Sequence, residues 1–469
     1  MDEVRIPEKI LSSPSGLFDR LRGAWRDVAE QFGIARSGIA PDLPPDDVET
    51  LRSQMRDCLE GRGGEVSARA RAAVLGQSYL ALNAEGRLRF LRILANEFGT
   101  DSDDVDAAIA LVETASDQTQ RLKAEQKLRE ALENPRVKLL TQFNALPDGI
   151  KFLVDLRGEL MNHTKGDVAL SALDADLRDL LSAWFDVGFL ELRRITWRSP
   201  ALVLEKIAGY EAVHAIESWR DLKNRLDSDR RFFAFFHPRM PDEPLIFVEV
   251  ALVKGMSANV RDLLDETAPV GDPRRADSAI FYSITSTQKG LAGISFGNFL
   301  IKRVADALGH EFPNLKTFAT LSPIPGFRAW LDGQIAAGDP LLPPERRELI
   351  QAGLSSVLAE ALDQDWIDNP AWAEAMSEPL LRLCAVYLTS LRENTARALD
   401  PVAHFHLSNG ARLERLNWLA DPSEKGIAQS AGIMTNYQYR LADVEENHEA
   451  YTGQGKIIVS SAVRALTKK

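Results

Sequence analysis

The segment FYSITSTQKGLAGISFGNFLIKRV, residues 281–304, is typical of a β-strand followed by a glycine-rich loop and a helix. The strand pattern ends at about Thr285, and the helical pattern begins near Asn298. Glycines allow a backbone to approach a ligand closely, and the first N–H groups of a helix point out of its end unpaired. Together with Lys289 they form a seat suited to a pyrophosphate. The glycines of the loop are Gly290, Gly293 and Gly297.

A tight strand–helix turn with structural glycines explains this pattern equally well. The segment lacks the GKS or GKT of a Walker loop, and its glycines do not form a clean GxGxxG fingerprint. Gln288 and the hydroxyls beside it add hydrogen-bond donors. The order of strand, glycine-rich loop, helix and strand is similar to the pyrophosphate loop of acetyltransferases of the GNAT type, which bind coenzyme A at this place.

The next segment, FATLSPIPGFRAWL at residues 318–331, contains a strand, a stiff exit and a helix. Pro323 and Pro325 fix φ and lack an N–H group, so they restrict the chain on the carboxyl side of Ser322. In isolation, a structural Ser–Pro strand terminator is the commoner explanation. In a GNAT-like sheet, however, the hydroxyl of Ser322 would face a gap between two parallel strands, where the acyl thioester lies.

Two histidines lie close together in VAHFHL, residues 402–407, which has the alternation of a β-strand. On a strand His404 and His406 share one face, and the apolar residues share the other. The Asn-Gly pair at 409–410 favours a hairpin turn after this strand. Two histidines at this spacing can also bind zinc, but no third ligand stands at a telling spacing, so we predict no metal.

Other candidate residues carry weaker signals. His214 lies in YEAVHAIESW, which we interpret as an amphipathic helix with a packing role for the histidine. Asn436, Tyr437 and Tyr439 belong to a late strand. They line the same cleft as the candidate serine and histidine, or the tyrosines pack in the core; the sequence does not decide between these alternatives.

The chain divides into a helical part, residues 1–190, and a mixed part, residues 191–469. The first part repeatedly places apolar residues three and four apart. The second contains β-branched and aromatic runs interleaved with helical ones. This predicts an α+β protein in which an all-helical bundle precedes a mixed α/β domain. The expected strands lie within residues 230–238, 243–253, 278–286, 315–323 and 433–441.

Composition restricts the function further. The net charge of −12 over 469 residues argues against a nucleic-acid or anionic-membrane binder. The two cysteines, Cys58 and Cys384, form no disulfide framework or CxxC motif, which suits a reducing compartment. The N-terminal residues lack the apolar core of a signal peptide, and no run is long enough to span a membrane. We therefore expect a cytoplasmic protein.

Taken in order, several segments resemble the malonyl-CoA decarboxylase family, bacterial type. The resemblance covers most of the chain from about Tyr210 to Tyr439 and is specific only when the motifs are combined. The segments that carry it are FFHPRMPDEPLIFVEVAL, the glycine-rich segment of residues 281–304, FPNLKTFATLSPIPGFRAWL, LRLCAVYL, DPVAHFHLSNGA, RLNWLADPSEKGI and GIMTNYQY.

The resemblance implies a GNAT-like catalytic domain that decarboxylates malonyl-CoA to acetyl-CoA and CO2. It implies no cofactor beyond the coenzyme A of the substrate, and assembly as a homodimer or homotetramer, partly through the helical domain. It places the family's catalytic serine and histidine on Ser322 and His406. It places the family's coenzyme A contacts on Ser283 and on Ala292, Gly293, Ile294, Ser295, Phe296, Gly297 and Asn298. Together with Gln288, Lys289 and Gly290, which the loop pattern itself suggests, and with Ser322 and His406, these residues form the predicted substrate site.

Two departures from the family pattern concern Ser295 and the C-terminus. Some relatives carry an acidic residue where this chain has Ser295, which makes a catalytic acid at that position doubtful. Animal members end in a peroxisomal tripeptide, whereas LTKK is not one, which favours the bacterial type.

Mechanism and function retain alternatives. Either His406 or Ser322 protonates the enolate that remains after CO2 departs. An acyl-CoA N-acyltransferase and a non-catalytic acyl-CoA-binding scaffold are the competing functions.

Overall fold

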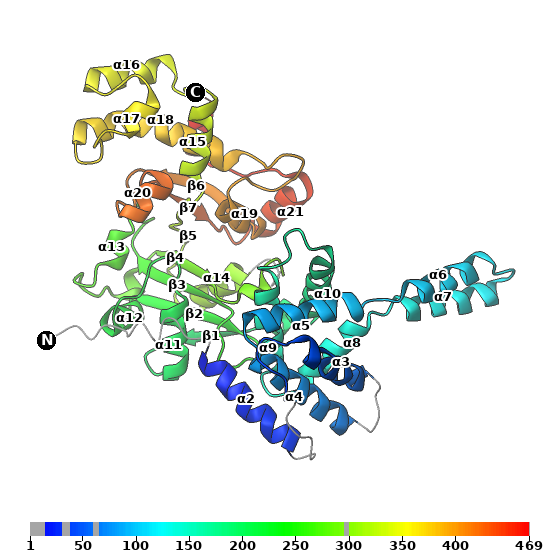
Figure 1. Cartoon of the computed structure of the whole chain (residues 1–469). Coiled ribbons are helices and arrows are strands. Elements are labelled where there is room, and N and C mark those ends of the chain that lie inside the picture. The colour runs from blue at the N-terminus through cyan, green and yellow to red at the C-terminus, as the bar shows by residue number, and fades with distance from the viewer. Residues whose placement is uncertain (1–14, 31–37, 60–64, 295–299, 469) are drawn as a thin grey trace.

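The computed structural model of the chain describes residues 15–30, 38–59, 65–294 and 300–468. A helical region comes first, and a region built on one mixed sheet follows it (Figure 1). The α+β class predicted from the sequence is therefore confirmed. Among the described residues, no helix combines the length and the apolar character needed to cross a membrane.

Periodic apolar residues build the helical region around an aromatic centre. Trp25, Tyr79 and Phe143 are buried there, and Phe152 makes edge-on ring contacts with Trp25 and Tyr79. The helices are α2 (Ser15–Glu30), α3 (Pro45–Leu59), α4 (Glu65–Ala81), α5 (Ala84–Glu97), α6 (Ser102–Glu113), α7 (Gln118–Leu132), α8 (Pro135–Gln142), α9 (Gly149–Leu160) and α10 (Val168–Trp184). The pair α6 and α7 projects away from the rest (Figure 1). In contrast, α9 is buried on almost every side, because it lies between the other helices and the mixed region.

The mixed region contains a seven-stranded sheet in the order β1-β2-β3-β4-β5-β7-β6. All neighbouring strands are antiparallel except β4 and β5, which are parallel. The strands are β1 (Glu191–Ile195), β2 (Arg230–Phe236), β3 (Ile246–Val253), β4 (Ser278–Ser286), β5 (Thr317–Thr320), β6 (Arg412–Asn417) and β7 (Met434–Gln438). The five segments expected as strands at 230–238, 243–253, 278–286, 315–323 and 433–441 contain β2, β3, β4, β5 and β7.

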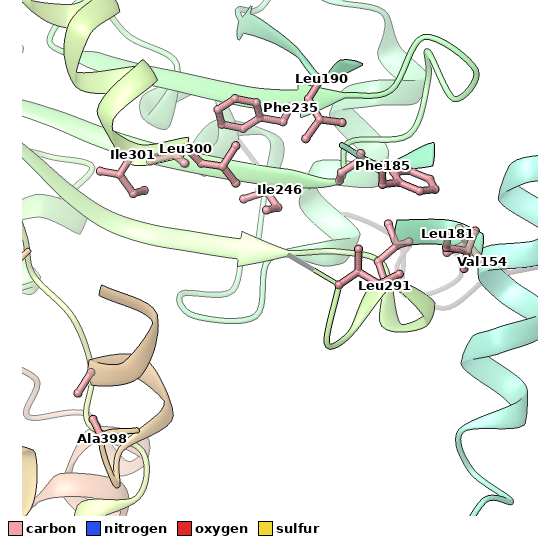
Figure 2. Packing of buried hydrophobic residues seen from close by; sticks show 14 of the residues in the cluster. Val154, Leu181, Phe185, Leu190, Phe235, Ile246, Leu291, Leu300, Ile301 and Ala398 are labelled. Carbon is pink, nitrogen blue, oxygen red and sulfur yellow. The ribbon is translucent and has the colours of Figure 1, made fainter. Parts of the chain in front are cut away.

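Helices cover both faces of the central strands, which explains why β2 is apolar on both sides. Phe232 and Phe236 pack with α11 and α12, whereas Phe233 and Phe235 face the side that carries α14. Figure 2 shows Phe235 near Leu300 of α14. The helices of this region are α11 (Ala201–Tyr210), α12 (Trp219–Arg225), α13 (Arg261–Leu264), α14 (Leu300–Glu311), α15 (Phe327–Ala337), α16 (Pro343–Ala352), α17 (Leu358–Leu362), α18 (Pro370–Thr389), α19 (Pro401–Ser408), α20 (Glu424–Ser430), α21 (Val444–Gln454) and α22 (Ser461–Leu466).

The parallel pair β4 and β5 separates before β4 ends. Their register runs from Ser278 opposite Thr317 to Phe281 opposite Thr320, and β4 then continues to Ser286 without β5, still paired with β3. Ser322, just past the end of β5, instead forms an isolated bridge with Thr435 of β7. After β5, the chain therefore separates from β4 and pairs with β7 at the position of the candidate serine.

The strand predicted for VAHFHL is wrong, because these residues form helix α19. The carboxylate of Asp400 accepts a hydrogen bond from the Ala403 N–H at 2.8 Å, and Pro401 occupies the first turn, so both helix-start signals are present. The Asn-Gly pair is not a hairpin turn either. Asn409 ends the helix, and Gly410 follows it with a φ of +80°.

The helix predicted around His214 is also wrong. Helix α11 ends at Tyr210, and α12 begins only after Ser218, whose hydroxyl accepts the Asp221 N–H at 3.0 Å. His214 lies in the connection between them. There its backbone N–H donates to Glu211 at 2.8 Å. A local acceptor thus replaces the helical hydrogen-bonding pattern at this position.

Candidate active site

Ser322 is fixed by its backbone and by its side chain. Its N–H donates to the Thr435 carbonyl at 2.8 Å, and its own carbonyl accepts from the Thr435 N–H at 2.9 Å. The hydroxyl donates to Thr320 Oγ1 at 2.8 Å, and the residue is 5% exposed. With proline at 323 and 325, the chain beyond it is stiff as well. The hydroxyl therefore has one well-defined direction.

His406 lies directly against this hydroxyl. Its Nε2 is 3.1 Å from Ser322 Oγ, and its Nδ1 is 2.8 Å from Tyr439 Oη. The imidazole stacks on the ring of Tyr437 at a centroid distance of 4.5 Å, and His406 is 3% exposed. The structure thus joins Ser322, His406 and two tyrosines of the late strand segment. His404 points elsewhere, since its Nδ1 is 2.8 Å from Tyr451 Oη.

The hydrogen bonds assign the protons of this cluster. Burial lowers the pKa of His406 to about 3, so the imidazole is neutral at pH 7. Burial raises the pKa of the Tyr439 hydroxyl, which therefore remains protonated and donates to Nδ1. Because the Ser322 hydroxyl donates to Thr320, Nε2 carries the ring proton and donates to Ser322 Oγ. A continuous donor chain then leads from Tyr439 through His406 to Ser322.

The lowered pKa of His406 predicts a loss of stability in acid. The unfolded chain binds a proton at this residue below its ordinary pKa of 6.5, whereas the folded chain resists protonation until about pH 3. The stabilisation is therefore complete above pH 6.5 and declines as the pH falls toward 3. Between pH 7 and pH 5, we expect the wild type to lose about 2 kcal/mol of unfolding free energy relative to His406→Asn.

Urea unfolding of both proteins at the two pH values measures this difference. Other titrating groups are common to both chains, so their effects cancel in the comparison. Equal losses in the wild type and the variant would contradict a buried neutral His406.

A second polar network holds the strand ends around the serine. Thr320 Oγ1 accepts the Tyr437 N–H at 3.1 Å, and the Thr320 carbonyl accepts from Asn436 Nδ2 at 2.6 Å. Asn436 Oδ1 in turn accepts from Arg415 Nε at 3.0 Å and Asn417 Nδ2 at 2.8 Å. Thr320 was not among the residues predicted from the sequence, although its position two residues before Ser322 on a strand places it on the same face. The partners on β6 gave no comparable signal.

The expected coenzyme A loop lies beside the helical region. Gln288 is buried and donates to Thr287 Oγ1 at 3.0 Å, and Lys289 Nζ donates to Asn162 Oδ1 at 2.5 Å. Gly293 has a φ of +76°, a conformation that favours glycine. Gly290, Ala292 and Ile294 complete the described part of this loop. Of the other predicted contacts, Ser295, Phe296, Gly297 and Asn298 lie outside the described residues.

Ser283 is engaged within the protein. Its hydroxyl donates to both carboxylate oxygens of Glu211, at 2.9 and 2.8 Å, and Thr285 donates to the same carboxylate at 3.1 Å. Burial and the nearby charge of Glu211 raise the pKa of Glu249, which pairs with Ser283 across the sheet, to about 8. In the described contacts, Ser283 therefore belongs to a buried carboxylate cluster and not to the Ser322–His406 pair.

A serine hydroxyl paired with a neutral, buried imidazole in an α+β fold is the arrangement of an acid–base enzyme. Within the described ranges, no group of three or more His, Cys, Asp or Glu residues is arranged to hold a metal ion.

Comparison with known proteins identifies the family. Residues 188–469 match the model of the malonyl-CoA decarboxylase C-terminal domain, and residues 98–185 match that of the N-terminal domain. The chain therefore belongs to the malonyl-CoA decarboxylase family.

The similarity to known relatives covers nearly the whole chain. Mitochondrial malonyl-CoA decarboxylase of Anser anser anser is 38% identical over 96% of this chain and 93% of its own. The Mus musculus enzyme is 36% identical over 90% and 89%. The malonyl-CoA decarboxylases of Rhodopseudomonas palustris and Agrobacterium vitis, known from crystal structures, are both 42% identical to this chain, with TM-scores of 0.81 and 0.80. They cover 89% and 90% of this chain and 99% and 100% of their own.

Proposed function

We propose that the protein converts malonyl-CoA to acetyl-CoA and CO2. The observation that carries this proposal is the 3.1 Å contact between Ser322 Oγ and His406 Nε2 in a member of this family. The two residues are 84 positions apart in the chain, and both are buried at the place where β4 and β5 separate. The substrate's nucleotide part is assigned to the loop from Gln288 to Ile294 and its predicted continuation, and the malonyl group to the serine.

The chemistry requires one bond cleavage and one proton. The bond between the α-carbon and the carboxylate carbon breaks, CO2 leaves, and the electron pair moves onto the thioester oxygen as an enolate. The α-carbon then takes up a proton to give the acetyl group. Backbone N–H groups that β4 no longer shares with β5 beyond Phe281 are suited to stabilising the enolate oxygen.

Orientation is the first task of the Ser322 hydroxyl. The departing carboxylate must stand perpendicular to the thioester plane, so that the breaking bond overlaps the carbonyl π-system. The oxygen of Ser322 is held in place by the bridge to Thr435 and by two prolines. When substrate binds, the serine O–H turns from Thr320 to the carboxylate and holds it in that position.

The same hydroxyl is the proton donor that this geometry favours over His406. Both ring nitrogens of His406 are occupied, Nε2 by Ser322 and Nδ1 by Tyr439. The imidazole therefore reaches the substrate through the serine oxygen. Ser322 gives its proton to the α-carbon and takes one from Nε2, while Nδ1 takes one from Tyr439. A proton from solvent restores the Tyr439 hydroxyl before the next turnover, so one proton is consumed for each CO2 released. Ser322 needs only to turn its O–H away from Thr320, whereas direct protonation by His406 would require the imidazole itself to leave one of its two partners.

A turnover assay without any acyl acceptor tests the function. Purified protein and malonyl-CoA alone should give acetyl-CoA and CO2 in equal amounts. Chromatography of the thioesters measures the acetyl-CoA, and capture of the gas measures the CO2. An N-acyltransferase would need an added amine, and a binding scaffold would leave malonyl-CoA intact. Unchanged malonyl-CoA under conditions where the protein is folded would refute the proposal.

A further inference from the structure

The coenzyme A loop is attached to the helical region by one buried arginine. Arg157 of α9 is 2% exposed. Its Nη1 donates to the Gly290 carbonyl at 2.7 Å and to the Ala292 carbonyl at 2.9 Å. Its Nε donates to Asp174 Oδ1 of α10 at 2.9 Å, which fixes the plane of the guanidinium. A single side chain thus binds two loop carbonyls and is itself held from behind.

The loop also packs closely on the backbone of α9. A Cβ atom added at Gly290 would lie 1.7 Å from the Val154 carbonyl oxygen, so no side chain fits there. A Cβ atom added at Gly158 would come within 3.4 Å of the Gly290 nitrogen. Figure 2 shows Leu291 pointing from the loop toward Val154 of α9 and Leu181 of α10. The contact residues on α9 recur at helical spacing, so one face of α9 is shaped to this loop.

Peptide geometry connects this attachment to the ligand side of the loop. A trans peptide group is planar, and its N–H points opposite to its C=O. Because Arg157 binds the Ala292 carbonyl on the α9 side, the N–H of Gly293 points away from α9. The positive φ of Gly293 then turns the chain sharply at this position. The arginine therefore sets the direction of a backbone donor in the segment expected to meet the pyrophosphate.

We propose that Arg157 is a positioning residue for acyl-CoA binding, acting through the carbonyls of Gly290 and Ala292. This proposal rests on the assignment of the loop to coenzyme A in the proposed function. It gives the helical region a part in substrate affinity. A loop held in its binding conformation before the ligand arrives loses less freedom on binding, and so binds more tightly.

The test compares Arg157→Gln and Arg157→Lys with the wild type in the full-length protein. Arg157→Gln should raise KM for malonyl-CoA and Kd for acetyl-CoA about tenfold, which is typical of a lost charge-assisted hydrogen bond. We expect kcat to change by less than about threefold, since the Ser322–His406 pair is untouched. Arg157→Lys keeps the positive charge but loses the planar guanidinium with its several N–H donors, so its KM and Kd should lie between those of the wild type and the glutamine variant.

Arg136→Gln is a matched control in the same helical region. Arg136 is also buried, with Nη1 donating to the Ala95 carbonyl at 2.8 Å and Nε to Asp176 at 2.6 Å. None of its described contacts is with the loop, so its loss should lower the melting temperature without changing KM or Kd. Equal affinity changes in the two glutamine variants would reduce Arg157 to a structural residue, and unchanged affinity in both would overturn the proposal.

Acetyl-CoA titration keeps this inference separable from the activity. A wild type that binds acetyl-CoA but does not decarboxylate malonyl-CoA would refute the proposed function, and the Arg157 comparison would still be decided by Kd. A wild type that binds no acetyl-CoA would overturn both. If Arg157→Gln does not fold, Arg157→Lys tests the proposal instead. A wild-type Kd for acetyl-CoA in that variant would contradict a role for the guanidinium group in positioning the loop.

Discussion

Replacing His406 with alanine is expected to lower kcat for malonyl-CoA by a factor of about a hundred to ten thousand, with the fold intact. This range is typical for the loss of an acid–base group. The imidazole is the only described link between Ser322 and the Tyr439 hydroxyl, so its removal leaves the serine with no partner to restore its proton. The measurement is steady-state acetyl-CoA formation, with the melting temperature recorded alongside.

His404→Ala is the matched control for this prediction. His404 lies on the same helix two residues away, but its ring faces Tyr451, and Tyr451 Oη also accepts the Ala398 N–H at 2.7 Å. We expect its kcat to stay within about threefold of wild type. Tyr439→Phe, which removes only the far end of the donor chain, should fall between the two histidine variants. A His406→Ala enzyme with nearly normal kcat would remove the imidazole from the mechanism.

The strands could be predicted because they carry local signals. The runs that became β2, β3 and β4 are rich in aromatic and β-branched residues and are buried along almost their whole length. Strand β1 was not predicted. Its sequence, ELRRI, is short and charged, and it lies at the edge of the sheet, where such residues are common.

The histidine helix shows where alternation misleads. Alternating histidine and apolar residues indicated a strand, yet Asp400 and Pro401 supply the start of a helix immediately before them. On an α-helix, residues two positions apart point to nearly opposite sides, which is why the two histidines have separate partners. The pairing of Ser322 with His406 came from the family resemblance. The secondary structure predicted for the histidines was wrong, because the segment forms a helix and not a strand.

The supporting contacts could not be predicted because they join distant segments. Arg157 and Gly290 are 133 positions apart, and only the packed fold shows that Gly290 lacks a side chain because a helix backbone lies against it. The sequence suggested ligand approach as the reason for this glycine. For Gly293, the positive φ gives a separate, conformational reason. Gly290 is therefore required by close packing and Gly293 by its backbone conformation, although both lie in one loop.

Replacing Ser322 with alanine is the second large effect that we expect. Turnover should fall at least about a hundredfold, because the variant loses both the group that orients the carboxylate and the group that delivers the proton. Acetyl-CoA affinity should remain close to wild type, because the product lacks the carboxylate that the hydroxyl holds. Calorimetric titration with acetyl-CoA and steady-state kinetics with malonyl-CoA measure the two quantities on the same preparations.

Ser430→Ala provides the comparison for a buried serine with a structural role. Among the described residues, its hydroxyl donates only to backbone carbonyls, at 2.7 Å to Ile433 and 3.2 Å to Gly426, so its loss should affect stability more than turnover. A Ser322→Ala variant that loses acetyl-CoA affinity and melts early would place Ser322 in this structural class.

Combining His406→Ala with Ser322→Ala tests the relay itself. Residues that act as one unit are not additive, since the first substitution already breaks the unit. The double variant should therefore be about as slow as the slower single variant. Losses that multiply would instead mean that the serine and the imidazole act on the substrate independently, which would require His406 to reach it without passing through the serine oxygen.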